Sequence, residues 1–347
     1  MNIAIVGSGI SGTTVAKRIL DKTNAHIDIY EMRSEPKAIC GGGLGEYALR
    51  RIMNYDEEIY NIMMKSTKTV IKTAKLQISD GQKTAEYDMS ADDLNIDRLG
   101  VVMDRHELDN TMLKTVIKMG ANFIPKTKVN PEELVGKYNY VIDARGVDAW
   151  DRNTKDMVVA YQEYYPKSSD DLVLYLNTNM YKLGYAWSFP KGNEVKVGYG
   201  EDAKIVGNRN REYMKLTKDV FGIRGAPIKV EGSPLPLSGD IKLKSGHIYR
   251  VGTAAGFIDP LTGGGIRMAV ESGIQLAKTI LKNEVWRYRF YSWKLETQIK
   301  LSLMIRKRLL SMSPDMQMKL LTFIQKNKPK DLDVYNYAKK VLLRFFT

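Results

Sequence analysis

The chain has 347 residues, of which 44% are hydrophobic and 27% are charged. This composition is typical of globular proteins, and the length suffices for two or three packed units of about 100–200 residues each. The single cysteine, Cys40, allows no internal disulfide, and an iron–sulfur cluster would need about four thiolates. The 3 histidines show no metal-ligand spacing, so we predict no metal site. Because a strand pattern begins at Asn2 without a signal peptide, and no apolar run has the roughly 18–20 residues of a membrane span, we expect a cytoplasmic protein.

The net charge of +13 is concentrated at one end of the chain. Residues 286–347 contain 14 Lys and Arg against 4 Asp and Glu, including the run Arg306-Lys307-Arg308. Apolar residues alternate with these charges: Leu301, Leu303, Met304, Leu309, Leu310, Met316, Met318, Leu320, Leu321 and Phe323. The pattern favours basic helices on an anionic membrane surface, with ordinary packing helices as the alternative. No recognition motif accompanies the charge, so nucleic acid is not expected as a partner.

The first thirty or so residues predict a strand, a helix and a second strand, over 2–6, 10–22 and 26–30. Between the first strand and the helix lies Gly7-Ser8-Gly9-Ile10-Ser11-Gly12, and Glu31 follows the second strand. In a dinucleotide-binding turn, Gly7 permits the tight turn, Gly9 lets a pyrophosphate approach the backbone, and Gly12 lets the helix pack on the sheet. The helix N-terminus favours an anion, and Glu31 is placed to bind a ribose. The alternative is an incidental glycine turn.

An α/β pattern continues through the first half of the chain. We expect helices over 46–65 and 105–119, β segments over 68–77 and 84–89, and a strand over 140–142. Consecutive strands without intervening helices then follow, over 157–164, 171–177, 184–189 and 194–199. Such a run indicates an antiparallel sheet. A strand over 247–252 and a helix from Gly264 restore the α/β pattern, and residues 287–347 predict three helices separated at Ser313-Pro314 and Pro329.

A second glycine-rich turn lies far from the first one. Residues 250–276 predict a strand that ends at Gly252, a small-residue turn with three consecutive glycines, and a helix. A cofactor that contacts glycine turns at both ends of the chain must be long, which suits FAD. The alternative is a plain glycine-rich loop.

These residues also carry a family resemblance. The matching motifs are GSGISG with Glu31, CGGGL at Cys40–Leu44, DRHELD at Asp104–Asp109, YAWSFP at Tyr185–Pro190, and GTAAGFIDPLTGGGI at Gly252–Ile266. The chain resembles the geranylgeranyl reductase family of flavoproteins, within the larger group of p-hydroxybenzoate hydroxylase-like FAD enzymes. CGGGL, Y-x-W-x-F-P and DPLTGGGI together are specific to these reductases, whereas GSGISG alone is shared by many enzymes.

The resemblance implies a set of FAD-binding residues. Ser11 and Gly12 are expected at the pyrophosphate, Glu31 at the ribose and Val129 at the adenine. Arg105 is expected to contact the cofactor through a charge-assisted hydrogen bond. The residues expected around the flavin and its ribityl chain are Cys40, Gly41, Gly43, Thr253, Gly264, Gly265 and Ile266.

Two positions depart from the family pattern. Thr253 stands where the family has an aspartate in Gly-Asp-Ala-Ala, and Arg145 stands where the family favours the acid of Ala-Asp-Gly. A hydroxyl can still donate or accept a hydrogen bond at the first position. The two departures leave a divergent activity open.

Cys40 and the YAWSFP motif are candidates for the reaction site. A thiol between flavin and substrate can relay a proton or gate the cavity, and the alternative is a small buried hydrophobe. Tyr185, Trp187 and Phe189 alternate, so a strand places all three on one face. Beside a flavin this face is expected to bind an apolar chain, whereas in the alternative it forms the core of its own sheet.

We therefore predict reduction of isoprenoid C=C bonds in geranylgeranyl chains of lipids or lipid precursors, with hydride from N5 of reduced FAD. Expected partners are a prenyl lipid, an external electron donor (ferredoxin or NAD(P)H, undecided) and the inner membrane face. The alternatives are an FAD-dependent hydroxylase of the same superfamily and a non-catalytic flavin- or lipid-binding paralogue.

The predicted fold is α/β with a discontinuous Rossmann-like FAD-binding lobe, an inserted antiparallel β-sheet substrate lobe and C-terminal helices. The FAD-binding domain is expected over 1–65, 97–152 and 238–285. The substrate domain is expected over 66–96 and 153–237, and the basic helical segment over 286–347.

Overall fold

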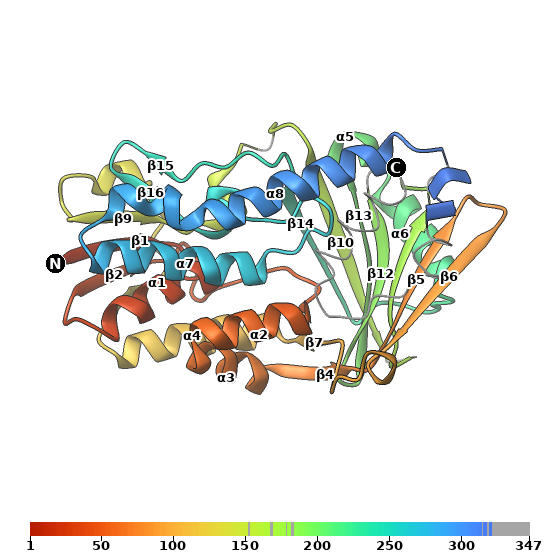
Figure 1. Ribbon diagram of the computed structural model, residues 1–347, viewed down its shortest axis with the longest axis horizontal. Coiled ribbons are helices and arrows are strands. Elements are labelled where there is room, and N and C mark those ends of the chain that lie inside the picture. Colours follow the sequence, from red (N-terminus) through yellow and green to blue (C-terminus); the bar gives the residue numbers. More distant parts are fainter. Residues whose placement is uncertain are drawn as a thin grey trace.

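The computed structural model describes residues 1–151, 153–166, 169–177, 179–181, 184–313, 315–317 and 319–320. Their strands form sheets of six, seven and three strands. Figure 1 shows the six-stranded sheet and its helices on one side of the molecule and the seven-stranded sheet on the other. We call these parts the α/β lobe and the β lobe. The predicted mixed fold, with a Rossmann-like part and a separate sheet, is confirmed.

The α/β lobe contains the six-stranded sheet in the order β15-β16-β9-β1-β2-β8. Its strands are β1 (Asn2–Val6), β2 (His26–Tyr30), β8 (Asn122–Ile124), β9 (Tyr140–Asp143), β15 (Lys244–Ser245) and β16 (Ile248–Arg250). All neighbours are parallel except β15 and β16. Ile3, Ile5 and Val6 of β1 are buried, as expected for a central parallel strand covered on both faces.

Helices α1 (Ile10–Leu20), α4 (Arg105–Lys118), α7 (Ile266–Leu281) and α8 (Tyr288–Leu310) pack in this lobe. In Figure 1, α7 lies between α1 and α8. Their shared core joins Ile5 with Val15 and Ile19 of α1, Leu276 of α7 and Ile299 of α8. α7 comes from the far end of the sequence but packs on α1. The second glycine turn, which precedes α7, therefore lies beside the first one.

The β lobe contains the seven-stranded sheet in the order β14-β10-β13-β12-β11-β5-β6. Its strands are β5 (Thr73–Ser79), β6 (Thr84–Ser90), β10 (Met157–Pro166), β11 (Leu172–Asn177), β12 (Tyr185–Lys191), β13 (Glu194–Asp202) and β14 (Lys229–Pro236). The sheet is antiparallel as predicted, except that β5 and β11 are parallel. β5 is far from β11 in the chain, so no hairpin fixes its direction. Helices α5 (Ala203–Val206) and α6 (Asn210–Val220) follow β13, and α6 covers one face with a Tyr-rich core.

Two elements differ from the sequence prediction because the chain breaks inside them. The helix expected over 46–65 is divided into α2 (Glu46–Tyr55) and α3 (Glu57–Lys65), since Asp56 is extended and its carboxylate caps α3 by accepting from the Ile59 N–H. The β segment expected over 68–77 is divided between β4 (Thr67–Ile71) and β5. β4 joins β3 (Gly43–Gly45) and β7 (Gly100–Met103) in the three-stranded sheet between the lobes.

The C-terminal segment is described only in its first half. Where the sequence predicts three helices over 287–347, the structure describes the long α8, and Met318, Leu321 and Phe323 lie outside the described residues. Arg306 is not on the surface as its basic neighbours suggest. Its side chain is 7% exposed and donates to the Pro260 carbonyl at 2.5 Å, because that side of α8 packs on the second glycine turn. No helix in the described part of the chain is long and apolar enough to cross a membrane.

Candidate functional site

A cavity of about 560 Å³ opens at the carboxyl ends of β1, β2 and β9. Ligands bind at this edge in open α/β sheets. Both glycine turns contribute to the wall, and residues 232–235 of β14 close it from the β lobe. Many of the predicted cofactor residues line the cavity: Gly7, Gly9, Ser11, Glu31, Cys40, Arg105, Val129, Thr253, Gly265 and Ile266. Gly12, Gly41, Gly43 and Gly264 do not line it, nor do the three aromatic residues of β12.

The three glycines of the first glycine turn have different roles. Gly7 has a φ of 107°, and an ideal Cβ there would lie 2.4 Å from the Ala144 carbonyl oxygen. At Gly12 a Cβ would lie 2.4 Å from the Gly7 carbonyl oxygen, so no side chain fits in the packing of α1 on the turn. A Cβ at Gly9 would have no heavy atom within 4 Å. Gly9 therefore leaves open space at the N-terminus of α1, where a phosphate would approach.

Glu31 is fixed at the cavity wall by hydrogen bonds. Its Oε2 accepts from the Ser8 hydroxyl at 2.7 Å and from the Ser8 N–H at 3.2 Å, and its Oε1 accepts from the Arg33 N–H at 3.1 Å. The side chain is buried although it lines the cavity. A fixed carboxylate beyond β2 is the expected acceptor for ribose hydroxyls.

Arg105 presents an unused donor near this wall. It is the first residue of α4, and its Nη2 donates to both carboxylate oxygens of the fully buried Asp109 at 3.1 Å. Burial raises the pKa of Asp109, and the Arg105 guanidinium opposes that rise. The Arg105 Nε is buried and has no hydrogen-bond partner in the described part of the chain. Such an orphaned donor is costly unless a ligand accepts from it.

The departure at Arg145 is explained by its own ion pair. The Nε and Nη2 of Arg145 donate to the two oxygens of Asp143, each at 2.9 Å, and Asp143 is fully buried. The bidentate pair draws the guanidinium back towards the end of β9. Arg145 still lines the cavity, so a positive group stands where the family has a carboxylate.

The second glycine turn is packed directly on the first. Gly252 has a φ of 59°, and a Cβ there would lie 2.8 Å from the Ser11 Oγ. The Thr253 carbonyl accepts from the Trp150 Nε1 at 2.6 Å, so a neighbouring residue of the cavity wall anchors the backbone of this turn. α7 then begins at Ile266, with no side-chain cap on its first turn. Gly264 is exposed outside the cavity, whereas Gly265 and Ile266 line it.

The CGGGL loop connects the cavity to the β lobe. Cys40 Sγ accepts from the Gly42 N–H at 3.3 Å. Gly42 has a φ of 83°, and a Cβ there would lie 2.3 Å from the Met103 carbonyl oxygen. Ideal Cβ atoms at Gly41 and Gly43 would lie 2.8 Å and 3.2 Å from the Phe189 ring. These two glycines therefore let the loop lie against the aromatic face of β12.

Lys196 is the main residue of this region that sequence reasoning misses. It is 2% exposed, and its Nζ donates to the carbonyl oxygens of Cys40 at 3.0 Å and Gly41 at 2.9 Å. Burial lowers the pKa of Lys196 to about 8. The signal for its burial is the strand pairing. Lys196 pairs with Phe189 in the β12–β13 register and so shares the aromatic face. Two carbonyls of the CGGGL loop thus depend on one buried ammonium.

Further polar side chains on the same face of the sheet surround Lys196. Gln162 donates to the Cys40 carbonyl at 3.3 Å and to Glu231 at 3.1 Å. Tyr164 also donates to Glu231, at 2.7 Å, and its ring lies 5.6 Å from the Lys196 Nζ. Lys229 completes the network through an ion pair of 2.6 Å with Glu231. The network holds the CGGGL loop through its backbone carbonyls and leaves the Cys40 side chain at the cavity wall.

The aromatic residues of β12 share one face, as predicted. The ring centroids of Tyr185 and Trp187 are 5.8 Å apart, and those of Trp187 and Phe189 are 6.3 Å apart. Gly198 on β13 makes room for the indole, since a Cβ there would lie 2.6 Å from the Trp187 ring. The Tyr185 hydroxyl donates to the Thr262 carbonyl at 2.5 Å, and the buried Trp187 Nε1 has no partner among the described residues. The face adjoins the CGGGL loop and the second glycine turn; its contact with a substrate stays a prediction.

No protein-family model matches the chain, but individual proteins do. It is 28% identical over 320 residues to a digeranylgeranylglycerophospholipid reductase of Methanocella arvoryzae, covering 81% of this chain and 77% of that protein. It is also 28% identical over 330 residues to a geranylgeranyl diphosphate reductase of Synechocystis, covering 81% and 75%. The chain is a sequence relative of the geranylgeranyl reductases. The resemblance predicted from its motifs is confirmed.

Solved structures agree with the fold. A geranylgeranyl bacteriochlorophyll reductase-like protein of Thermoplasma acidophilum matches with a TM-score of 0.78 at 20% identity, over 99% of this chain and 95% of that one. A myxobacterial FAD-dependent halogenase matches with a TM-score of 0.60 at 13% identity, over 85% and 78%. At these identities the matches establish the shared fold.

Proposed function

We propose that this protein is an FAD-dependent reductase of isoprenoid C=C bonds in geranylgeranyl chains of lipids or lipid precursors. The observation that supports it most is the position of the CGGGL loop. This loop lies between a dinucleotide-type cavity and an aromatic sheet face, in a chain related to geranylgeranyl reductases along four-fifths of its length. Cofactor and apolar substrate would therefore meet at Cys40.

The cavity fits FAD in three respects. Both glycine turns line it, so that one ligand can contact both. Gly9 leaves open space at the N-terminus of α1 for the pyrophosphate. The orphaned Arg105 Nε supplies a buried donor for a cofactor oxygen.

We infer the individual contacts from this arrangement. Ser11 would hold the pyrophosphate, Glu31 the ribose, and Val129, in the loop that follows β8, the adenine. Thr253, Gly265 and Ile266 would present backbone groups to the flavin end. For Gly12, Gly41, Gly43 and Gly264, which do not line the cavity, we infer a role in shaping the turns.

When bound and reduced, FAD supplies a hydride from N5 to one carbon of the alkene. The chain's own residues orient the substrate and exclude water. Tyr185, Trp187 and Phe189 would pack along the prenyl chain, and their apolar surroundings favour its transfer from water. The neighbouring carbon needs a proton. Cys40 is our candidate for relaying it, because its side chain is at the cavity wall and Lys196 and Gln162 fix its carbonyl.

The electron donor and the place of reaction are also inferences. The sequence holds no second strand–G-x-G-x-x-G–helix unit, so NAD(P)H would bind only transiently, and ferredoxin is the other candidate. Prenyl lipids partition into bilayers, so we infer that the protein works peripherally at the inner membrane face.

Purification tests the proposal directly. The protein should be yellow, release FAD on denaturation and carry a prenyl lipid that mass spectrometry identifies. An FAD-dependent hydroxylase would instead consume O₂ when its substrate is added. A non-catalytic paralogue would bind flavin or lipid without turnover. Colourless protein with no flavin would contradict the cofactor assignment itself.

A further inference from the structure

The solvent-facing side of α8 carries large apolar residues, most of them gathered around the start of the helix. Trp286, in the short turn before the helix, is 79% exposed, Phe290 is 62%, Trp293 is 52% and Met304 is 60% exposed. Phe290 and Trp293 follow Trp286 at helical spacing, so these three residues share one face. We call the set Trp286, Phe290, Trp293 and Met304 the outer stripe. A helix on the surface of a globular protein normally turns polar residues to this side.

The packing of the fold does not account for the outer stripe. α8 already buries Leu295, Ile299 and Ile305 on its opposite side, against α7 and the glycine-turn region. Exposed aromatic residues at consecutive turns of one helix form a continuous apolar surface. Such a surface calls for an occupant from outside the described fold.

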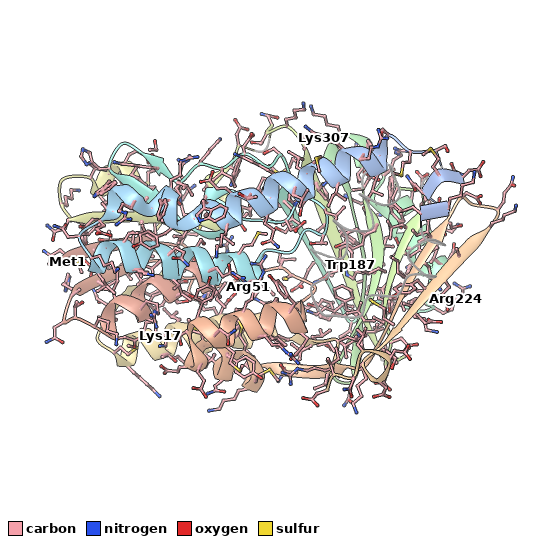
Figure 2. All side chains as sticks on the ribbon, viewed as in Figure 1. Met1, Lys17, Arg51, Trp187, Arg224 and Lys307 are labelled. Carbon is pink, nitrogen blue, oxygen red and sulfur yellow. The ribbon has the colours of Figure 1, made fainter. Side chains whose placement is uncertain are left out.

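Exposed cations flank the outer stripe along the helix: Arg289, Lys294, Lys300, Lys307 and Arg308. Figure 2 shows Lys307 at the outer edge of α8. The one acid of α8, Glu296, is buried and ion-paired with Arg289 at 3.0 Å. This side of the helix therefore carries positive charge with no exposed carboxylate.

A hollow of about 240 Å³ adjoins the outer stripe between α2, α7 and α8. Lys278 and Lys294 line it together with the rings of Tyr55, Phe290 and Trp293 and with the ion pair of Arg51 and Glu271. Cations beside aromatic rings suit a phosphate-bearing headgroup above an apolar layer.

We propose that the outer face of α8 docks on the surface of an anionic phospholipid bilayer. The outer stripe would enter the acyl boundary while the flanking cations bind lipid phosphates. An acidic carrier protein would use the charges but has no need of two exposed tryptophans. A second copy of this chain would bring like charges together. Charge and apolar surface in one helix therefore favour the bilayer.

The docked helix would lie next to the reaction site, and this consequence rests on the proposed function. From the buried side of α8, Ser302 donates to Asp259 at 3.0 Å and Arg306 donates to the Pro260 carbonyl. Thr262 of the same turn accepts from Tyr185, at the start of the aromatic face. The half of α8 that carries Met304 would thus lie beside this turn when the helix is docked.

Vesicle binding tests the docking face with the full-length holoenzyme. Its partition into phosphatidylcholine vesicles should rise when phosphatidylglycerol is added and fall as salt is raised. The variant Trp286→Ser/Phe290→Ser/Trp293→Ser and the variant Lys294→Gln/Lys300→Gln/Lys307→Gln should each bind at least about tenfold more weakly. Ile228→Ser/Val230→Ser, which removes exposed apolar residues from the β lobe, should change binding by less than about twofold. Lys22→Gln/Lys114→Gln/Lys118→Gln is the matched control for charge and should behave the same way.

A measurement on the unmodified protein makes the test independent of variant folding. Trp150 and Trp187 are buried, so brominated lipids should quench mainly Trp286 and Trp293. Absence of quenching, or equal binding by both face variants and their controls, would overturn the proposal. Loss of a dimer in the aromatic variant, with vesicle binding unchanged, would assign the face to a second copy. No step requires turnover, so a failure here leaves the reductase proposal standing.

Discussion

Replacing Lys196 by methionine isolates the effect of one buried charge beneath the CGGGL loop. Methionine keeps an unbranched side chain of similar length, so the volume between Tyr164 and Phe189 stays filled. What is lost is the ammonium group and its two hydrogen bonds to the Cys40 and Gly41 carbonyls.

The size of the effect follows from the pKa of Lys196. Burial lowers this pKa from 10.5 to about 8. A difference of about 2.5 in pKa corresponds to roughly 3 kcal/mol of free energy. Below about pH 8 the folded and unfolded states both hold the proton, and the full destabilisation is present. Between about pH 8 and 10.5 the unfolded chain keeps a proton that the folded protein has released, so the free energy of unfolding rises with pH.

Chemical denaturation of both proteins across this window provides the assay. Between pH 7 and pH 10, wild type should gain about 2–3 kcal/mol in free energy of unfolding relative to Lys196→Met. Lys204→Met, at an exposed position of α5, is the matched control and should follow wild type. Curves for Lys196→Met and wild type that stay parallel over the whole window would refute the assignment of a buried, loop-binding ammonium.

Three other predictions concern the cavity and the aromatic face. Gly9→Val should lose most bound FAD while its thermal midpoint stays within about 2 °C of FAD-free wild type, because the new side chain enters open space; full FAD occupancy would count against the pyrophosphate position. Arg105→Gln should lower FAD affinity and destabilise the protein by about 3–5 kcal/mol in a denaturation experiment, because Asp109 is left buried without its cation. Unchanged stability would show that the fold does not need the Arg105–Asp109 pair. Trp187→Ala should reduce kcat/KM for long prenyl substrates about tenfold or more with FAD retained, whereas a large fall in thermal midpoint with unchanged kcat/KM would assign the ring to the sheet core.

The sequence predicted the elements whose signals are local. The β1–α1–β2 unit follows from hydrophobic spacing and from the glycine pattern, in which Gly7 and Gly12 leave no room for a Cβ. The aromatic face of β12 follows from alternation along one strand. The break at Asp56 was missed because an apolar helical pattern continues on both sides of it, and only the capping carboxylate shows where α3 begins.

Lys196 and Arg306 could not be placed from local signals. Lysine and arginine are rarely buried, so both positions indicate a surface when they are considered alone. The burial of Lys196 depends on strand pairing with Phe189, and that of Arg306 on the side of α8 that packs against Pro260. Both are consequences of tertiary packing between segments far apart in the chain.

Anaerobic single turnover tests the central claim most directly. The holoenzyme is reduced without O₂, mixed with a geranylgeranyl lipid, and followed by flavin absorbance and by mass spectrometry of the lipid. We predict that the yellow absorbance returns as the lipid gains two hydrogen atoms for each flavin reoxidised. Flavin that stays reduced while the lipid mass does not change would contradict reduction of the prenyl C=C bond.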